Sequence, residues 1–314
     1  MAEEAAHPQD GPSFSQELLV HVGSRAVSKT LMAPFDRVKV LLQCESELIR
    51  QERLPTQGFG GMRNCIRHCT GSENPINLWR GNAVNCLGII PTAIAQVGVG
   101  TPLQKTLFEG IPHESTTGLA IASVTAAVIS AMTVATIVYP IDLIRFSLSC
   151  DVIYGRNRAM RYGGAVDFVK TTLASREGQR RGALYRGLCL SLSGNVLYRF
   201  SFLTLNNLMT LAIPVPRPTA DEGDFVAYNR KLLLVNYFAV LAATIWAYPI
   251  DTVRRRIMLT VNSKHSYDHF LDCVMHINKT EGSIGFFRGL HFVVIRNLVA
   301  GTLAALTGIG FYSQ

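Results

Sequence analysis

The chain has 314 residues and a formal net charge of +8, and 48% of its residues are apolar while only 17% are charged. An average soluble domain carries about 25% charged residues. This composition, with a mean hydropathy of +0.21, therefore argues against a pair of soluble domains and favours a helical membrane protein. The seven cysteines are odd in number and form no CxxC pair, which argues against a disulfide framework.

Residues 1–13 are expected to form a short polar tail. The tail carries Glu3, Glu4 and Asp10 but no lysine or arginine. A secretory signal begins with basic residues and a transit peptide is rich in arginine. The tail has the features of neither.

Six long helical segments follow the tail in pairs. They are predicted over residues 14–43, 82–107, 117–150, 188–213, 232–259 and 290–311. Each exceeds the roughly 20 residues that a helix needs to cross the hydrocarbon core of a bilayer. Pro34, Pro140 and Pro249 lie inside the first, third and fifth segments. A proline inside a helix removes a backbone donor and kinks the helix.

A Pro-x-acid-x-x-base pattern recurs at these three prolines, which are 106 and then 109 residues apart. The acid and base of each copy are Asp36 and Lys39, Asp142 and Arg145, and Asp251 and Arg254. Ionisable residues near a membrane are expensive and need partners. Three copies at near-equal spacing predict an internal repeat, with repeats over 14–112, 113–215 and 232–314 and a connecting loop over 216–231.

Three cations interrupt otherwise apolar spans: Lys29, Arg199 and Arg296. A basic residue inside a span normally faces the bundle interior or a water-filled cavity. The three together favour a polar cavity between the helices.

Long polar loops join the two helices of each repeat, over residues 45–78, 151–184 and 260–286. Each loop contains a candidate short amphipathic helix, near 62–70, 165–175 and 270–279. Basic residues outnumber acidic ones in the second loop. Because positive loops stay on the side from which insertion is directed, we expect all three loops in one compartment and both termini in the other.

Each long loop ends in an aromatic-Arg-Gly triplet: Trp79-Arg80-Gly81, Tyr185-Arg186-Gly187 and Phe287-Arg288-Gly289. Two loops also carry an aromatic residue followed by two glycines before the short helix, at Gly60-Gly61 and Gly163-Gly164. A helix N-terminus beside a cation suits a lipid phosphate. These residues are the candidate lipid-binding set, although any one triplet alone is also typical of an interface anchor.

With these motifs in register, the chain resembles the mitochondrial carrier family over nearly all its length after the tail. The resemblance implies six transmembrane helices in three pseudosymmetric repeats with short matrix helices. It implies a multi-pass protein of the mitochondrial inner membrane, both termini in the intermembrane space, that works by alternating access and binds cardiolipin but no cofactor. It also implies a matrix gate of three ion pairs: Asp36–Arg145, Asp142–Arg254 and Asp251–Lys39.

Within that family the chain looks most like the ADP/ATP carriers. Arg254-Arg255-Arg256-Ile-Met-Leu259 is similar to their Arg-Arg-Arg-Met-Met-Met signature. A nucleotide needs clustered cations and an aromatic face for its base. Lys29 and Arg296 supply the cations, Tyr198 the aromatic face, and Gly194 a close backbone approach. Small-residue helix packing is an equally good explanation of Gly194.

Two departures from the ADP/ATP carriers bear on function. Gly88 stands where those carriers have a substrate-contacting arginine. The positions of the family's cytosolic gate also carry no charge: Thr101, Gln104, Asn207, Thr210, Gly308 and Phe311. The matrix half of the gate is therefore intact in the sequence, and the cytosolic half is absent.

Three functional hypotheses follow. The first is ADP/ATP-type nucleotide exchange by alternating access. The second is a transport-impaired, cardiolipin-binding structural subunit of a larger inner-membrane complex, such as a respiratory complex. The third is a carrier for another small anion, which Gly88 would permit. The sequence shows no nucleophile–base pair or metal-ligand set, so we expect neither an enzyme nor a metal site, and no nucleic-acid partner.

Overall fold

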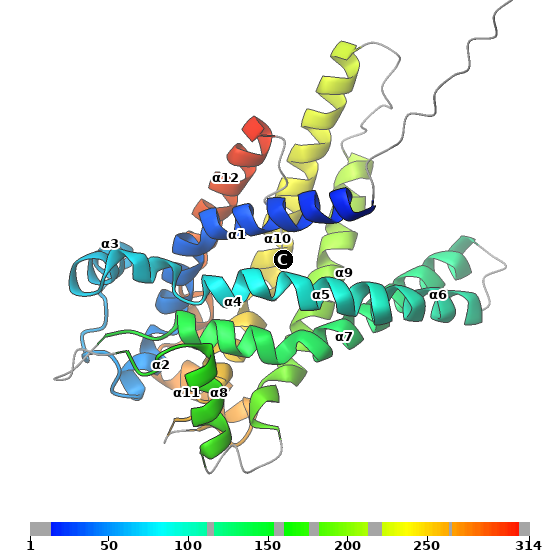
Figure 1. The fold of residues 1–314 in the computed structure, drawn as a ribbon. Coiled ribbons are helices and arrows are strands. Elements are labelled where there is room, and N and C mark those ends of the chain that lie inside the picture. The colour runs from blue at the N-terminus through cyan, green and yellow to red at the C-terminus, as the bar shows by residue number, and fades with distance from the viewer. Residues whose placement is uncertain are drawn as a thin grey trace, which may run out of the picture.

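The computed structural model describes residues 14–111, 116–153, 160–175, 182–212, 222–263 and 266–307, and these residues form helices and connecting loops without strands. The expected all-α architecture is confirmed (Figure 1). The tail over residues 1–13 and the positions of Gly308 and Phe311 lie outside the described residues.

Five of the six predicted long helices are single helices. They are α1 (Phe14–Gln43), α7 (Thr116–Ser149), α9 (Leu188–Ala212), α10 (Glu222–Leu259) and α12 (Leu290–Thr307). Pro34, Pro140 and Pro249 lie inside α1, α7 and α10. The helix α10 begins ten residues before the predicted start at Leu232, because residues 224–231 contain no proline or glycine to stop it.

The second predicted helix is broken into four pieces: α4 (Asn82–Leu87), α5 (Ile89–Ala95), the π-turn η3 (Gln96–Gly100) and α6 (Thr101–Gly110). The breaks occur where this helix packs closely on α7. A Cβ atom added at Gly88 would lie 3.0 Å from Ile141 Cγ2, and one at Gly100 would lie 2.8 Å from Val134 Cγ2. Glycine at these two positions therefore lets the two helices approach.

Short helices occupy the long loops, as predicted. They are α2 (Glu45–Arg50), α3 (Met62–Arg67), η1 (His68–Ser72), η2 (Pro75–Trp79), α8 (Ala165–Ala174), η4 (Ala183–Tyr185), α11 (Phe270–Thr280) and η5 (Ser283–Phe287). In Figure 1, α2, α3, α8 and α11 gather at one end of the molecule, from which the long helices diverge. We call this the loop end.

Four stretches of the described residues are long and apolar enough to cross a membrane: Pro75–Gly110, Ile121–Ser149, Ala183–Thr210 and Leu234–Leu259. The helix α1 is not among them, because it carries Lys29, Asp36, Arg37 and Lys39 within about three turns. The first expected span is therefore helical but does not meet this test of length and apolarity.

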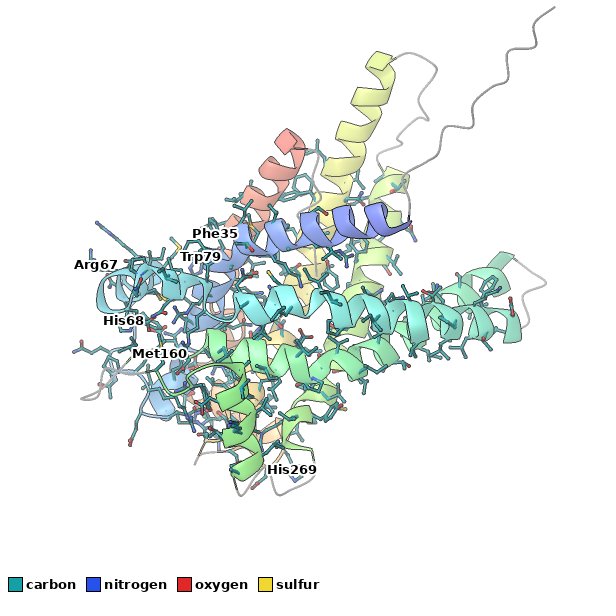
Figure 2. The ribbon with its side chains drawn as sticks, in the orientation of Figure 1. Phe35, Arg67, His68, Trp79, Met160 and His269 are labelled. Carbon is teal, nitrogen blue, oxygen red and sulfur yellow. The ribbon has the colours of Figure 1, made fainter. Side chains whose placement is uncertain are left out.

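The loop end also holds the largest buried cluster of apolar side chains. Leu41, Leu143 and Met258, from α1, α7 and α10, lie in it with Phe168 of α8. Trp79 of η2 adds a polar contact to α1, because its indole Nε1 donates a hydrogen bond to the Thr30 carbonyl at 2.9 Å (Figure 2). The ends of α1, α7 and α10 are thus packed together, while the other ends of the long helices diverge.

A buried ion pair fastens α1 into this core. Arg37 and Glu73 have side chains 1% and 0% exposed, and their charged atoms lie 2.8 Å apart. Arg37 also donates to the carbonyls of Ser149 (3.3 Å), the last residue of α7, and of Asp151 (2.8 Å), two residues beyond it. One arginine therefore joins α1, the first loop and the second repeat.

Replacing Arg37 with methionine is expected to destabilise the protein by about 3–5 kcal/mol, because it leaves the buried Glu73 carboxylate without its partner. The thermal unfolding midpoint in detergent measures this loss. The combined change of Arg37→Met and Glu73→Gln is expected to be less damaging than Arg37→Met alone. Arg67→Met, at an exposed site on α3 (Figure 2), is the control. Equal shifts for Arg37→Met and Arg67→Met would contradict the prediction.

Candidate functional site

A small cavity of about 30 Å³ lies between α1, α4, α7 and α12. Its lining residues are Ser28, Lys29, Met32, Asp36, Asn85, Arg145 and Arg296. This volume holds about one water molecule, so the charged side chains have closed on one another. Two of the four residues predicted to bind substrate, Lys29 and Arg296, meet here.

Asn85 holds two of the cations in this cavity. Lys29 Nζ donates to the Asn85 carbonyl at 3.1 Å, and Arg145 donates to Asn85 Oδ1 at 2.8 Å. The third cation, Arg296, forms an ion pair with Asp36 at 2.6 Å, which joins α12 to α1. Neutral oxygens and a single carboxylate thus face three positive charges.

The three predicted gate pairs do not all form in this state. The ion pair Lys39–Asp251 is present at 3.7 Å between α1 and α10. The pair Asp36–Arg145 is absent, because Asp36 is taken by Arg296. Arg145 lies instead 4.0 Å from Asp142 in its own helix.

The third expected pair, Asp142–Arg254, is also replaced by a contact within one helix. Arg254 lies 4.0 Å from Asp251, one turn away on α10. Asp251 thus collects Lys39, Arg254 and Arg255, the last at 2.8 Å. Gln43 supports this group by donating to Asp251 (3.4 Å) and to Thr252 (2.8 Å). Assigning one base to each acid of the three motifs does not predict this group, because Asp251 alone pairs with several bases.

The arginine triplet has split roles. Arg254 and Arg255 bind Asp251, and Arg255 also lies 5.7 Å from the centre of the Phe146 ring. Arg256 is buried and forms an ion pair with Glu281, beyond α11. Two arginines therefore belong to the charged centre, while the third fastens the third loop to α10.

The balance of charge around this centre is strongly positive. Its described bases are Lys29, Lys39, Arg145, Arg254, Arg255 and Arg296, and its acids are Asp36, Asp142 and Asp251. With twice as many bases as acids between low-dielectric helices, the centre attracts an anion. Charge-assisted bonds to phosphate or carboxylate are the strong ones that such a set forms.

Gly194 and Tyr198 are not brought into the cavity with Lys29 and Arg296. A Cβ atom at Gly194 would lie 3.2 Å from Ile250 Cγ2, so this glycine packs α9 against α10. The Tyr198 ring stacks on Phe202 with centroids 6.4 Å apart. Arg199 was expected in the same polar cavity, but it lines a separate, largely apolar one between α7 and α9.

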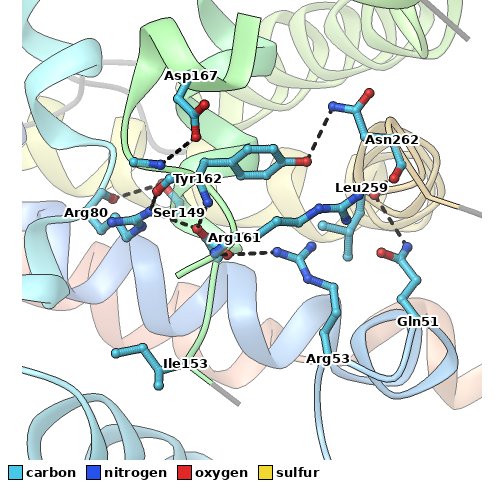
Figure 3. Close-up of polar contacts among 12 residues, drawn as sticks. Gln51, Arg53, Arg80, Ser149, Ile153, Arg161, Tyr162, Asp167, Leu259 and Asn262 are labelled. Carbon is cyan, nitrogen blue, oxygen red and sulfur yellow. Dashed lines mark hydrogen bonds and ion pairs between the residues drawn. The ribbon is translucent and has the colours of Figure 1, made fainter. Parts of the chain in front are cut away.

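The arginines predicted to bind lipid phosphate make contacts with other parts of the protein. Arg80 binds Asp151 at 2.7 Å (Figure 3), and Arg288 binds Glu45 at 2.8 Å. Arg186 donates to Thr260 Oγ1 at 3.0 Å and to a loop carbonyl. Each partner lies at the end of the first helix of the next repeat, so these arginines link the repeats in a ring.

The glycine after each of these arginines makes the link possible. Gly81, Gly187 and Gly289 adopt φ of 85°, 84° and 82°, a left-handed conformation that suits glycine. Their Cβ positions would lie 2.8, 3.7 and 3.4 Å from the carbonyl oxygens of the gate bases Arg145, Arg254 and Lys39. The backbone of each of the three gate bases therefore packs against the glycine that follows an arginine of this ring.

The double glycines before the short helices differ between repeats. The Gly163 N–H donates to Asp167 at 2.8 Å (Figure 3), so a carboxylate already lies at the start of α8. Asp272 accepts from the His269 N–H at 2.9 Å at the start of α11. In the first repeat, a Cβ atom added at Gly60 would contact only the Asn64 side chain. A Cβ atom added at Gly61 would contact nothing within 4 Å. In this repeat a carboxylate also lies close by, since the Phe59 N–H donates to Glu45.

Several residues of the site were missed from the sequence, and the repeat register could have found the acids. Glu45, Asp151 and Thr260 each follow the gate base of their repeat by six residues. Asp151 is fully buried and holds both Arg53 (3.0 Å) and Arg80 (2.7 Å). Asn85 gave no such signal, because its role depends on where two cations from other helices meet.

Comparison with known proteins agrees with this architecture. The family model described as mitochondrial carrier protein matches residues 10–110, 118–213 and 228–308. The chain is 29% identical to ADP,ATP carrier protein 1 of Saccharomyces cerevisiae, over 93% of this chain and 92% of that protein. It is 29% identical to human ADP/ATP translocase 4, over 95% of this chain and 89% of that protein. It is 28% identical to an ADP,ATP carrier protein of Neurospora crassa, over 93% and 91%.

The Arg256–Glu281 ion pair predicts a pH dependence of stability. Burial raises the pKa of the Glu281 carboxyl, but the hydrogen bond and charge of Arg256 outweigh burial and hold the pKa below 4.5. A lowered folded-state pKa stabilises the protein in full above the unfolded value and is lost as pH falls through the folded value. Glu281→Gln should therefore lower the unfolding midpoint at pH 7, and the difference from the parent protein should shrink below pH 4.5. Glu109→Gln, at an exposed site on α6, is the control. A difference independent of pH would contradict this assignment.

Proposed function

The chain belongs to the mitochondrial carrier family, and on that premise we propose that it exchanges ADP for ATP across the mitochondrial inner membrane. Carriers of this family are transporters rather than enzymes. The observation that supports a nucleotide is the excess of cations around Lys29, Arg145 and Arg296. The relatives named ADP/ATP carriers, at 28–29% identity, support the same substrate.

In the proposed mechanism, substrate phosphates compete with Asp36 for Arg296. Binding to Arg296 and Lys29 would release the Asp36 carboxylate from its 2.6 Å ion pair. The freed carboxylate can then pair with Arg145, which is the arrangement expected for a matrix gate. A ligand shifts an equilibrium only by binding the two states differently, and this exchange of partners supplies that difference.

Tyr198 is the proposed contact for the adenine ring. Its side chain stacks on Phe202 of the same helix and belongs to the helix that packs against α10. Base stacking on an aromatic face is tolerant of sequence and geometry. Opening of the 30 Å³ cavity would be needed to bring this ring and the cations to one ligand.

We propose cardiolipin as the bound lipid, held by backbone N–H groups rather than by arginine side chains. The glycines Gly81, Gly187 and Gly289 precede the helices that start at residues 82, 188 and 290. Free N–H groups at a helix start bind phosphate. The arginines of the three triplets would contribute positive charge near the lipid rather than direct contacts, since their side chains are directed to neighbouring repeats. Both termini are proposed to lie in the intermembrane space, opposite the loop end.

A second candidate function is a structural, cardiolipin-binding subunit of a larger inner-membrane complex. Its support is the end of the molecule opposite the loop end, where the hydroxyls of Thr101 and Thr210 bond to carbonyls of their own helices. Among the described residues, neither hydroxyl bridges to a different long helix, which is in keeping with a chain that lacks a gate at this end. The space of a substrate arginine at Gly88 is also partly filled by Ile141.

Lys29→Ala and Arg296→Ala are each expected to reduce exchange of labelled ADP for ATP in liposomes by about tenfold to hundredfold. The reason is the loss of one charge-assisted bond to phosphate, about 1.5–3 kcal/mol. Arg67→Ala, at an exposed site of the loop end, is the control and should exchange at the parent rate. Equal rates for all three variants would exclude both cations as ligands.

The same liposomes separate the candidate functions. A folded preparation that exchanges neither nucleotide nor any small anion, and that migrates with a large complex in native electrophoresis of solubilised membranes, supports the subunit. Exchange of another small anion in place of ADP and ATP would support a carrier with a different substrate. Migration only as a free monomer would remove the subunit hypothesis.

A further inference from the structure

Arg199 is the one predicted cavity cation that the candidate site does not use. It lies inside the apolar span Ala183–Thr210 and its side chain is exposed. It forms no ion pair or hydrogen bond within the part of the chain that the structure describes. Basic residues inside a membrane normally pair with another group or face a water-filled cavity, so Arg199 lacks the partner that its position requires.

The surroundings of Arg199 are an apolar groove between two helices. A cavity of about 260 Å³ is lined by Val124, Thr125, Val128 and Ile129 of α7 and by Val196, Arg199, Phe200 and Leu203 of α9. Phe200 is 67% exposed and Leu203 is 44% exposed. The groove is thus open to whatever surrounds the protein, and Arg199 is its only charged lining residue.

This groove lies on a different face of α9 from the candidate site. Successive helical residues are rotated by about 100°, so Arg199 is turned by that angle from Tyr198. Leu203 and Val196 are turned still further from Tyr198. Gly194, on the Tyr198 side, packs against Ile250 of α10. The groove therefore faces away from α10, and no step of the proposed exchange uses it.

The depth of Arg199 restricts what its partner can be. It lies 11 residues after the start of α9 and 13 before its end, or about 17 and 20 Å along the axis. The hydrocarbon core is about 30 Å thick, so Arg199 is close to its middle. Lipid headgroups, whether phosphate or carboxylate, lie outside that core. A carboxylate held in mid-membrane by a polypeptide matches this depth.

We propose that the α7–α9 groove docks a transmembrane helix of another polypeptide that carries an Asp or Glu near mid-membrane. The carboxylate pairs with Arg199, and a neighbouring side chain of that helix fills the cavity. A second copy of this chain does not fit, because the acids within its own described spans are Asp142 and Asp251, which belong to the charged centre, and Glu109, which lies at the end of its span rather than near mid-membrane. The proposal goes beyond nucleotide exchange and gives the chain a specific partner surface.

Photo-crosslinking in native membranes tests the partner. The photoreactive residue p-benzoylphenylalanine replaces Phe200 in the groove or, as control, Trp246 of α10, which is 69% exposed. The expected result at position 200 is an adduct with a protein, mapped by mass spectrometry to within one turn of an Asp or Glu in a transmembrane segment. No such adduct is expected at position 246. Adducts with lipid or fatty acid alone at position 200, or the same protein adducts at both positions, would overturn the proposal.

Charge reversal tests the ion pair itself. Arg199→Glu should reduce the share of the chain that migrates with its partner by about tenfold or more, since truncating one member of a buried pair is costly. Arg199→Lys should retain most of that share. Changing the partner's mapped acid to arginine should restore co-migration of Arg199→Glu. Arg67→Glu, outside the spans, should co-migrate as the parent does.

The unfolding midpoint of each variant establishes that the protein is folded, and Arg199→Gln replaces Arg199→Glu if the latter does not fold. Unchanged co-migration of a folded Arg199→Glu or Arg199→Gln would overturn the proposal, as would failure of the partner's reversal to restore Arg199→Glu. Nucleotide exchange is measured separately with Lys29→Ala, so failure of one proposal does not imply failure of the other.

Discussion

The rest of the structure depends on a ring of arginines that each reach from one repeat to the next. The three links are Arg80 to Asp151, Arg186 to Thr260 and Arg288 to Glu45. The glycine after each arginine brings the following helix against the backbone of a gate base. Because the ring fixes where the gate bases lie, the geometry of the charged centre follows from residues that do not belong to that centre.

The sequence predicted the parts of this arrangement that repeat and missed the parts that do not. The three proline motifs and triplets predicted six helices, short loop helices and a bundle with one charged end. The resemblance to the carrier family also implied the pair Lys39–Asp251, which is present. The exchange of partners by Asp36 and Arg254 was not predicted, because an acid among several bases takes the cation that the packing brings closest. The lipid role of Arg80 was assigned from its neighbours in sequence, whereas its partner Asp151 lies 71 residues away.

Arg199 is a second case in which the sequence did not predict where a side chain lies. Hydropathy placed three cations inside apolar spans, and inward orientation was expected for all three. Lys29 and Arg296 follow that expectation, but Arg199 is turned to another face of α9. Gly194, on the Tyr198 side of α9, packs against Ile250 of α10. On α9, Arg199 is rotated from Tyr198 by about 100°, and only Arg199 lines the cavity between α7 and α9.

Exposure divides the ion pairs of the molecule into two groups with different roles. The carboxylates of Glu73 and Asp151 are 0% exposed, and removing a partner from such a pair costs several kcal/mol. These pairs hold the loop ends of the helices together permanently.

The acids of the charged centre are partly hydrated, with Asp251 23% exposed and Asp36 40% exposed. Water replaces part of a lost partner there, so these pairs break at low cost. An exchanger needs two states of similar energy, and ion pairs that a substrate anion can displace meet that requirement. The arginine ring joins the three repeats through partners outside the charged centre, so the ion pairs of the centre can break without breaking these links.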